Sequence, residues 1–94
     1  MLYIESLEID DHILEKIESR HGVSFEEAEE ACLSDRHHVR RSREGLYKLF
    51  GQIEAGRYIL VVLVNLGGGR WRVATARDMT DTERRLYRRT IGGK

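Results

Sequence analysis

The stretch RYILVVLVNL, residues 57–66, decides the fold because it has the composition of a strand buried on both faces. Every residue from Tyr58 to Val64 is apolar, yet the run is far shorter than the roughly 20 residues that cross a bilayer. A strand covered on both faces needs neighbours on both sides. We therefore expect residues 57–66 to be the central strand of a sheet.

The sequence on either side of this strand predicts two antiparallel neighbours. Residues 47–53 alternate with a period of two, and Glu54-Ala55-Gly56 then supplies a tight turn. Gly67-Gly68-Gly69 allows the chain to reverse again, and it lacks the spacing of a phosphate-binding loop. Residues 70–79 form the next alternating strand.

In residues 70–79 a strict period of two places every second side chain on one face. One face would carry Trp71, Val73, Thr75 and Arg77, and the other Arg72, Ala74 and Ala76. Arg77 is therefore expected at the edge of the covered face of the sheet.

Three helices flank these strands in the sequence. The first begins at Asp10 or Asp11 and ends at His21-Gly22, where glycine suits a left-handed cap. The second covers about residues 25–33 behind the capping box Ser24/Glu27. The third follows the capping box Thr80/Glu83, runs through Arg89, and stops at Gly92-Gly93.

These elements predict an α+β fold with a small antiparallel β-sheet of about four strands. Two N-terminal helices and one C-terminal helix accompany the sheet, and residues 2–9 form a short first strand or an extended lead-in. A chain of 94 residues suits one domain, residues 1–94. Cys32 is the single cysteine, no zinc or redox spacing occurs, and no apolar leader is present, so we expect a cytoplasmic protein without metal or cofactor.

Charge is segregated along the chain although the formal net charge is zero. Residues 1–35 contain eleven acidic and two basic residues, a net charge of −9, so residues 36–94 carry +9. Thirteen of the sixteen basic residues are arginine, whose planar fork of donors suits phosphate and carboxylate. The two segments either bind partners of different kinds or neutralise each other across the fold.

Arginines are concentrated in the last strand and the last helix. The pairs Arg84/Arg88 and Arg85/Arg89 repeat at i, i+4, a spacing at which like charges repel by a few tenths of a kcal/mol. An RNA backbone or an acidic protein surface would neutralise them, whereas the alternative is a solvated basic face. The cluster comprises Arg70, Arg72, Arg77, Arg84, Arg85, Arg88 and Arg89.

Other side chains leave two interpretations open. Arg77 either forms a structural ion pair, for example with Glu83, or clamps a phosphate. Tyr87 packs inward with its hydroxyl at the rim of the core. Of the adjacent His37 and His38 at most one can serve a given site, because neighbouring strand residues point to opposite faces, and a surface role is favoured.

Two separated motifs resemble the BrnT-type toxins of bacterial toxin–antitoxin modules, within the RelE-like ribonuclease superfamily. Residues 20–28, RHGVSFEEA, are similar to the family's KHGVSFEEA segment, and residues 76–87 are similar to its SAR-x-x-T-x-x-E-R-x-x-Y ending. The resemblance extends from about Ile9 to Arg89. It departs at the N-terminus, where Tyr3 to Glu8 replace the family's aromatic-acidic opening, so the chain resembles a divergent member.

The resemblance implies a RelE-like fold and a metal-independent endoribonuclease that a co-encoded antitoxin, typically a DNA-binding protein, neutralises in a hetero-oligomer. In such enzymes the 2′-hydroxyl of the RNA attacks the adjacent phosphate, and arginines neutralise the developing charge. By motif, the catalytic positions are Arg77, Glu83, Arg84 and Tyr87, with Arg77 and Arg84 on phosphate and Glu83 or Tyr87 moving protons. The expected RNA-binding residues are Arg57, Arg70, Arg72, Arg85 and Arg88.

A second hypothesis is a non-catalytic protein- or RNA-binding module that keeps the toxin scaffold and the antitoxin contact. The altered opening at Tyr3 to Glu8 is compatible with such a loss of cleavage. Direct DNA binding by this chain is disfavoured, because no helix-turn-helix pattern accompanies the basic helix.

Overall fold

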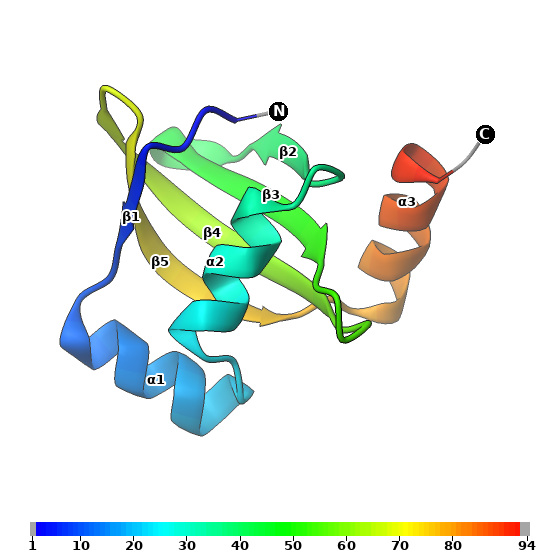
Figure 1. The fold of residues 1–94 in the computed structure, drawn as a ribbon, viewed down its shortest axis with the longest axis horizontal. Helices are drawn as coiled ribbons and strands as arrows, with labels where there is room; N and C mark the ends of the chain where they lie inside the picture. The colour runs from blue at the N-terminus through cyan, green and yellow to red at the C-terminus, as the bar shows by residue number, and fades with distance from the viewer. Residues whose placement is uncertain (1, 93–94) are drawn as a thin grey trace.

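A computed structural model describes residues 2–92 as three α-helices and a five-stranded mixed sheet. The elements in chain order are β1 (Ser6–Glu8), α1 (Asp11–His21), α2 (Phe25–Leu33), β2 (His38–Arg41), β3 (Leu46–Gln52), β4 (Tyr58–Gly67), β5 (Arg70–Asp78) and α3 (Asp81–Ile91), with a short 3-10 turn, Arg43–Gly45, before β3 (Figure 1). The predicted α+β class and the three helices are confirmed, and Gly93 lies outside the described residues.

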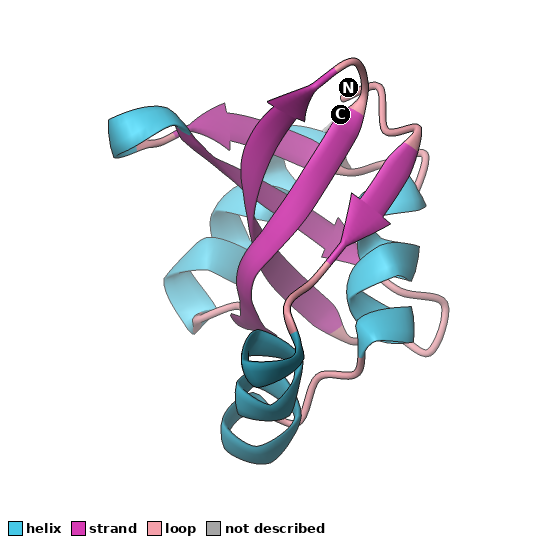
Figure 2. Ribbon diagram, turned by 90° about the vertical axis from the view of Figure 1, so that its left-hand side faces the viewer, coloured by secondary structure: helices cyan, strands magenta, loops and turns pink. Residues whose placement is uncertain are grey.

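The strand order is β1-β5-β4-β3-β2, so β4 lies at the centre, as its apolar sequence predicts. The sheet differs from the expected antiparallel one in two ways. The short β2 adds a strand, paired antiparallel to β3, and β1 pairs in parallel with β5 at the opposite edge (Figure 2). The sequence does not show either strand by its periodicity, because β2 has four residues and β1 only three.

Helices α1 and α2 cover one face of the sheet. The main core on this face includes Ile17, Ala28 and Ala31 from the helices with Leu49 and Val61 from the strands. The predicted glycine cap at the end of α1 and the predicted capping box at the start of α2 are both present. Gly22 adopts the left-handed conformation with φ 65°, and Ser24 and Glu27 form the reciprocal hydrogen bonds of a capping box.

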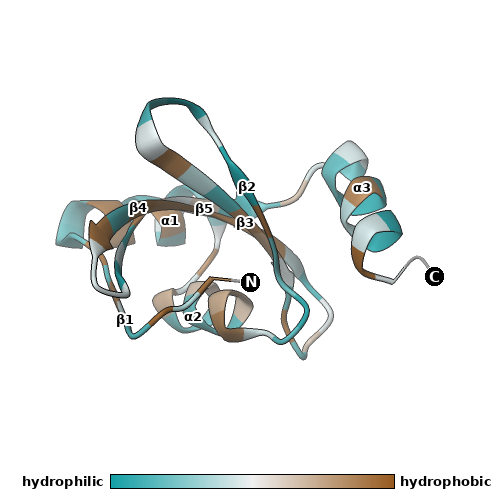
Figure 3. Cartoon of the chain, turned by 90° about the horizontal axis from the view of Figure 1, so that it is seen from above, coloured by the Kyte–Doolittle hydropathy of each residue, from teal (hydrophilic) through white to brown (hydrophobic). Residues whose placement is uncertain are grey.

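Helix α3 packs on the opposite face through a smaller core of Phe50, Leu60, Met79 and Tyr87. Its first turn has the predicted capping box, in which Thr80 accepts from the Glu83 amide and Glu83 accepts from the Thr80 amide. Seen from above, α2 lies against the sheet while α3 stands at the far end of the strands (Figure 3). A groove remains between α3 and the β2–β3 edge.

A β-bulge in β5 makes one expectation wrong. Leu63 pairs with Val73 and Val62 pairs with Thr75, so Ala74 has no partner on β4. The extra residue reverses the alternation, because each later side chain moves to the other face. Ala76 therefore joins the main core, and Arg77, whose partner across the ladder is Leu60, lies on the α3 face rather than with Trp71 and Val73.

Candidate functional site

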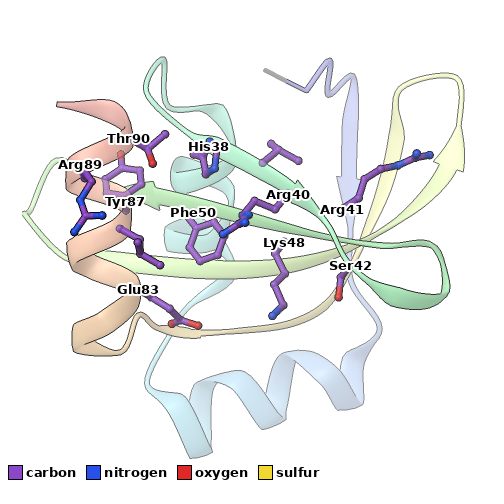
Figure 4. A pocket seen from close by; sticks show the side chains of 12 residues that line it. His38, Arg40, Arg41, Ser42, Lys48, Phe50, Glu83, Tyr87, Arg89 and Thr90 are labelled. Atoms are coloured by element: carbon purple, nitrogen blue, oxygen red, sulfur yellow. The ribbon is translucent and has the colours of Figure 1, made fainter. Parts of the chain in front are cut away.

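The groove between α3 and the β2–β3 edge has a volume of about 860 Å³. The strand side includes two cross-strand pairs that share one face of the sheet, because His38 lies opposite Phe50 and Arg40 opposite Lys48. The helix side carries one stripe of α3, and Figure 4 shows the side chains of both walls. The lining residues are His38, Val39, Arg40, Arg41, Ser42, Lys48, Phe50, Glu83, Leu86, Tyr87, Arg89 and Thr90.

The groove is rich in positive charge. Four of its lining residues are arginine or lysine, whereas Glu83 is the single carboxylate among them. Phe50 and Leu86 add apolar surface, and Leu86 is 42% exposed. A concave surface with several cations and an exposed apolar side chain suits a phosphate backbone with unstacked bases.

Arg77 and Glu83 form a bidentate ion pair beside this groove. The Arg77 Nη1–Glu83 Oε1 distance is 2.9 Å and the Nη2–Oε2 distance is 3.0 Å. The pair links the end of β5 to the first turn of α3, where Glu83 Oε1 also accepts from the Thr80 amide. Of the two alternatives for Arg77, the structure contains the ion pair with Glu83.

This ion pair determines how Glu83 titrates. Hydrogen bonds from Arg77 lower the pKa of the Glu83 carboxyl, and the Thr80 amide and Lys48 lower it further against the opposing effect of burial. A carboxylate with a lowered pKa is a weaker proton acceptor at neutral pH. Glu83 is therefore better suited to orienting neighbouring groups than to removing a proton.

Tyr87 is buried between the helix and the sheet. Its hydroxyl donates to the carbonyl oxygen of Arg36 at 3.0 Å, and its ring meets Tyr58 edge-to-face with centroids 6.0 Å apart. Burial raises the pKa of Tyr87, so the hydroxyl stays protonated through the neutral range. The expected inward packing of Tyr87 is confirmed.

Arg84 and Arg88 project from α3 toward Tyr58 on β4. Each guanidinium carbon lies 5.9 Å from the centre of the Tyr58 ring, which permits a cation–π interaction. Arg84 also pairs with Asp81 one turn earlier on the helix. These contacts offset the repulsion expected from the i, i+4 spacing of the two arginines.

The other predicted RNA-binding arginines lie away from the groove. Arg57 joins the α1–α2 junction to the end of β5, with contacts to the carbonyls of His21 and Gly22 and ion pairs to Glu27 and Asp78. These partners give Arg57 a structural role.

Three further arginines of the predicted set differ in their surroundings. Arg70 and Arg72 both pair with Glu8 on the parallel edge strand, at 3.3 and 3.8 Å. Arg85 is exposed on α3 and lines neither the main groove nor the smaller hollow of about 350 Å³ beside Tyr58 and Arg88.

Ten of the twelve lining residues were absent from the predicted site, among them His38, Arg40, Lys48 and Arg89. The pairing of β2 with β3 would identify His38, Arg40 and Lys48, because it places them on one face of the sheet. The sequence alone does not reveal this pairing, because the four-residue β2 is too short to be recognised by its periodicity.

The described residues offer no converging set of three metal-ligating side chains, and they include no helix with the length and apolarity of a membrane span.

Comparison with known proteins identifies the family. A family model described as the ribonuclease toxin BrnT of type II toxin–antitoxin systems matches residues 10–83. No curated protein matches the sequence significantly. Among solved structures, the 1.1 Å crystal structure of the Brucella abortus ribonuclease toxin BrnT has a TM-score of 0.68 with 15% identity, covering 81% of this chain and 97% of that one. The match over most of the sequence shows that this chain belongs to the BrnT family of ribonuclease toxins of type II toxin–antitoxin systems.

Proposed function

We propose that the domain of residues 1–94 cleaves RNA without a metal ion, in the groove between α3 and the β2–β3 edge. The observation that carries the proposal is the concentration of cations there around one carboxylate that Arg77 already neutralises. Such a groove attracts a polyanion and leaves the cations free to stabilise a second negative charge as it develops on phosphorus.

Cleavage begins with attack of an RNA 2′-hydroxyl on the adjacent phosphorus. We place this phosphate between Arg40 and Lys48 on the strands and Arg89 on the helix, because all three line the groove. Their charge favours the transition state, in which the phosphate oxygens become more negative than in the substrate.

Two of the four catalytic residues predicted by motif, Glu83 and Tyr87, lie on the helix wall of this site. Glu83 and Tyr87 line the groove, Arg77 holds Glu83 in place, and Arg84 and Arg88 lie beside them along α3. The assignment of Arg77 and Arg84 to phosphate, and of Glu83 or Tyr87 to proton transfer, requires that RNA displace their present partners.

The same groove is the surface at which we expect an antitoxin to bind and block the activity. The family implies an antitoxin partner, and we propose that it is a DNA-binding protein whose acidic segment covers the basic groove in a cytoplasmic hetero-oligomer. The partly exposed Leu86 beside the cations gives such a segment an apolar contact as well as charge complementarity.

Two measurements test this function. Expression of the chain with and without its genetic neighbour is expected to give growth arrest and RNA decay only without the neighbour. The purified protein is expected to cleave RNA in the presence of a chelator, with 2′,3′-cyclic phosphate and 5′-hydroxyl ends.

A charge-reversal variant locates the activity. Arg40→Glu with Lys48→Glu is expected to abolish cleavage, whereas Lys16→Glu with Arg20→Glu, on the exposed side of α1, preserves it. If the wild-type protein binds its antitoxin but cleaves no RNA in either assay, the chain is a non-catalytic module instead.

A further inference from the structure

His38 is the groove residue whose chemistry suits acceptance of a proton at neutral pH. The strand β2 places it on the α3 face, opposite Phe50 on β3. The two rings lie 6.2 Å apart with an interplanar angle of 32°, so Phe50 limits the orientations of the imidazole. Figure 4 shows His38 on the strand wall, facing Tyr87 and Thr90 on α3.

The other proton-transfer candidates in the groove are already engaged. Both oxygens of Glu83 accept hydrogen bonds from Arg77, and the Tyr87 hydroxyl donates to a backbone carbonyl. Lysine and arginine are cations at neutral pH and have no free electron pair with which to accept a proton. No hydrogen bond from another described residue occupies the ring nitrogens of His38, whereas His37 uses both of its own.

The surroundings of His38 combine a base with phosphate-binding cations. Arg40 lies two residues along the same strand, and its partner across the ladder is Lys48. A phosphate held by these two side chains lies beside the imidazole on the same face of the sheet. General-base catalysis requires this combination of a neutral acceptor next to a bound phosphate.

We propose that His38 is the general base that removes the proton from the attacking 2′-hydroxyl of RNA, an inference that rests on the proposed ribonuclease function. The proton moves from the hydroxyl oxygen to a ring nitrogen of His38 while the O2′–P bond forms. The P–O5′ bond then breaks with its electron pair on O5′, which takes a proton from water. The products are a 2′,3′-cyclic phosphate and a 5′-hydroxyl end, and no oxidant or co-reactant is consumed.

The electrostatics of the groove keep this histidine neutral. Burial lowers the pKa of His38, and the charge of Arg40 lowers it further. The other charged residues of the groove are Arg41 and Lys48 on the strand wall and Glu83 and Arg89 on α3, where Tyr87 is a further titratable group. The imidazole is therefore the unprotonated acceptor at pH 7.

The decisive test compares His38→Ala with wild type on an oligonucleotide that spans a mapped cleavage site. Cleavage is expected to fall about 100-fold or more, the usual contribution of a general base. Binding to the same oligonucleotide with a 2′-deoxy sugar at the cleaved position is expected to be unchanged, because His38 acts on the hydroxyl that this analogue lacks. Added imidazole is expected to restore part of the cleavage, which a purely structural role does not predict.

The control variant is His12→Ala, an exposed histidine on α1, which is expected to cleave as wild type does. His38→Gln, compared by thermal unfolding, replaces His38→Ala if the alanine variant unfolds. The wild-type rate itself is expected to fall on acidification with a midpoint below the ordinary histidine value, in line with the lowered pKa. Undiminished cleavage by a folded His38 variant overturns the inference and leaves the ribonuclease function intact, whereas a wild type that never cleaves overturns both.

Discussion

Arg77 shows how one residue connects the sheet to the basic helix. Its guanidinium forms two hydrogen bonds to Glu83 and a third to the carbonyl oxygen of Asp78, so it ties the end of β5 to the first turn of α3. The Glu83 side chain is only 20% exposed, which strengthens the pair relative to one at the open surface.

Replacement of this arginine tests its structural role. Arg77→Lys is expected to lower the free energy of unfolding by about 1 kcal/mol, near the upper end for partly exposed pairs, because lysine cannot reproduce the bidentate geometry. Chemical denaturation of this variant and of Arg85→Lys, which lies exposed on α3, measures the difference. Lost cleavage at unchanged stability would instead favour the phosphate clamp.

His37 ties the N-terminal segment to the start of β2. Its Nδ1 lies 2.9 Å from the carbonyl oxygen of Ser34, and its Nε2 lies 3.1 Å from the amide nitrogen of Leu2. A carbonyl only accepts, so Nδ1 carries the proton and Nε2 accepts from Leu2, which requires a neutral ring.

This arrangement predicts a pH dependence of stability. Burial is the main cause that lowers the pKa of His37 in the folded state. The neutral ring therefore contributes stability above the unfolded pKa of about 6.5, and that contribution is lost as the pH falls from there through the folded pKa. Unfolding free energies measured between pH 7.5 and about pH 5 are expected to fall more steeply for wild type than for His37→Gln. Parallel curves would show that His37 does not titrate on folding.

At the scale of elements, the capping box of α2 stabilises the first turn of that helix. Ser24 Oγ accepts from the Glu27 amide at 3.0 Å and Glu27 Oε1 accepts from the Ser24 amide at 3.0 Å. Ser24→Ala is expected to cost about 1 kcal/mol of stability without changing cleavage per folded molecule. Thermal unfolding and activity measured beside Ser19→Ala, an exposed position within α1, separate the two effects, and a selective loss of activity would place Ser24 in the site.

The contact of β3 with α2 depends on a glycine. A Cβ atom at Gly51 would lie 2.7 Å from the carbonyl oxygen of Ala31, closer than packed atoms approach. Gly51→Ala is expected to destabilise the fold by about 1–3 kcal/mol, since the helix must move away from the sheet. Denaturant unfolding checks this against the exposed neighbour Gln52→Ala, and equal stability of the two variants would contradict the close packing.

At the scale of the molecule, the opposite charges of the two sequence segments lie largely on different faces. The acidic helices α1 and α2 cover one face of the sheet, whereas β2 and α3 carry cations to the other. Local pairs such as Arg57–Glu27 and Arg70–Glu8 neutralise part of the charge across the fold, whereas the groove has four cations and one carboxylate among its lining residues.

The affinity for the antitoxin is therefore expected to depend on salt. Because exposed charges are screened beyond about 8–10 Å at physiological ionic strength, the complex of the toxin with its antitoxin is expected to weaken as salt rises. Titration calorimetry at low and high salt measures this change. An affinity that stays constant would show that apolar contacts, not the basic groove, hold the partner.

The helix caps, the turns and the central strand of this protein can be predicted from the sequence alone. The two capping boxes, the glycine at the end of α1, the turns at Gly56 and Gly67–Gly69, and the buried central strand each depend on residues a few positions apart. The chemistry of those residues therefore predicts the helices and three of the strands. The resemblance to the BrnT family likewise rests on two short motifs, residues 20–28 and 76–87, and the family model confirms it.

The tertiary structure alone decides which face each functional side chain occupies. The bulge at Ala74 moves Arg77 to the α3 face, and the pairing of β2 with β3 brings His38 and Arg40 beside Lys48. Both depend on hydrogen bonds between strands, which a periodic pattern does not specify when a strand is short or carries one extra residue. The sequence thus determined the three helices, with the arginine-rich one among them, and three of the five strands. The strand register, set by packing between distant segments, determined the groove.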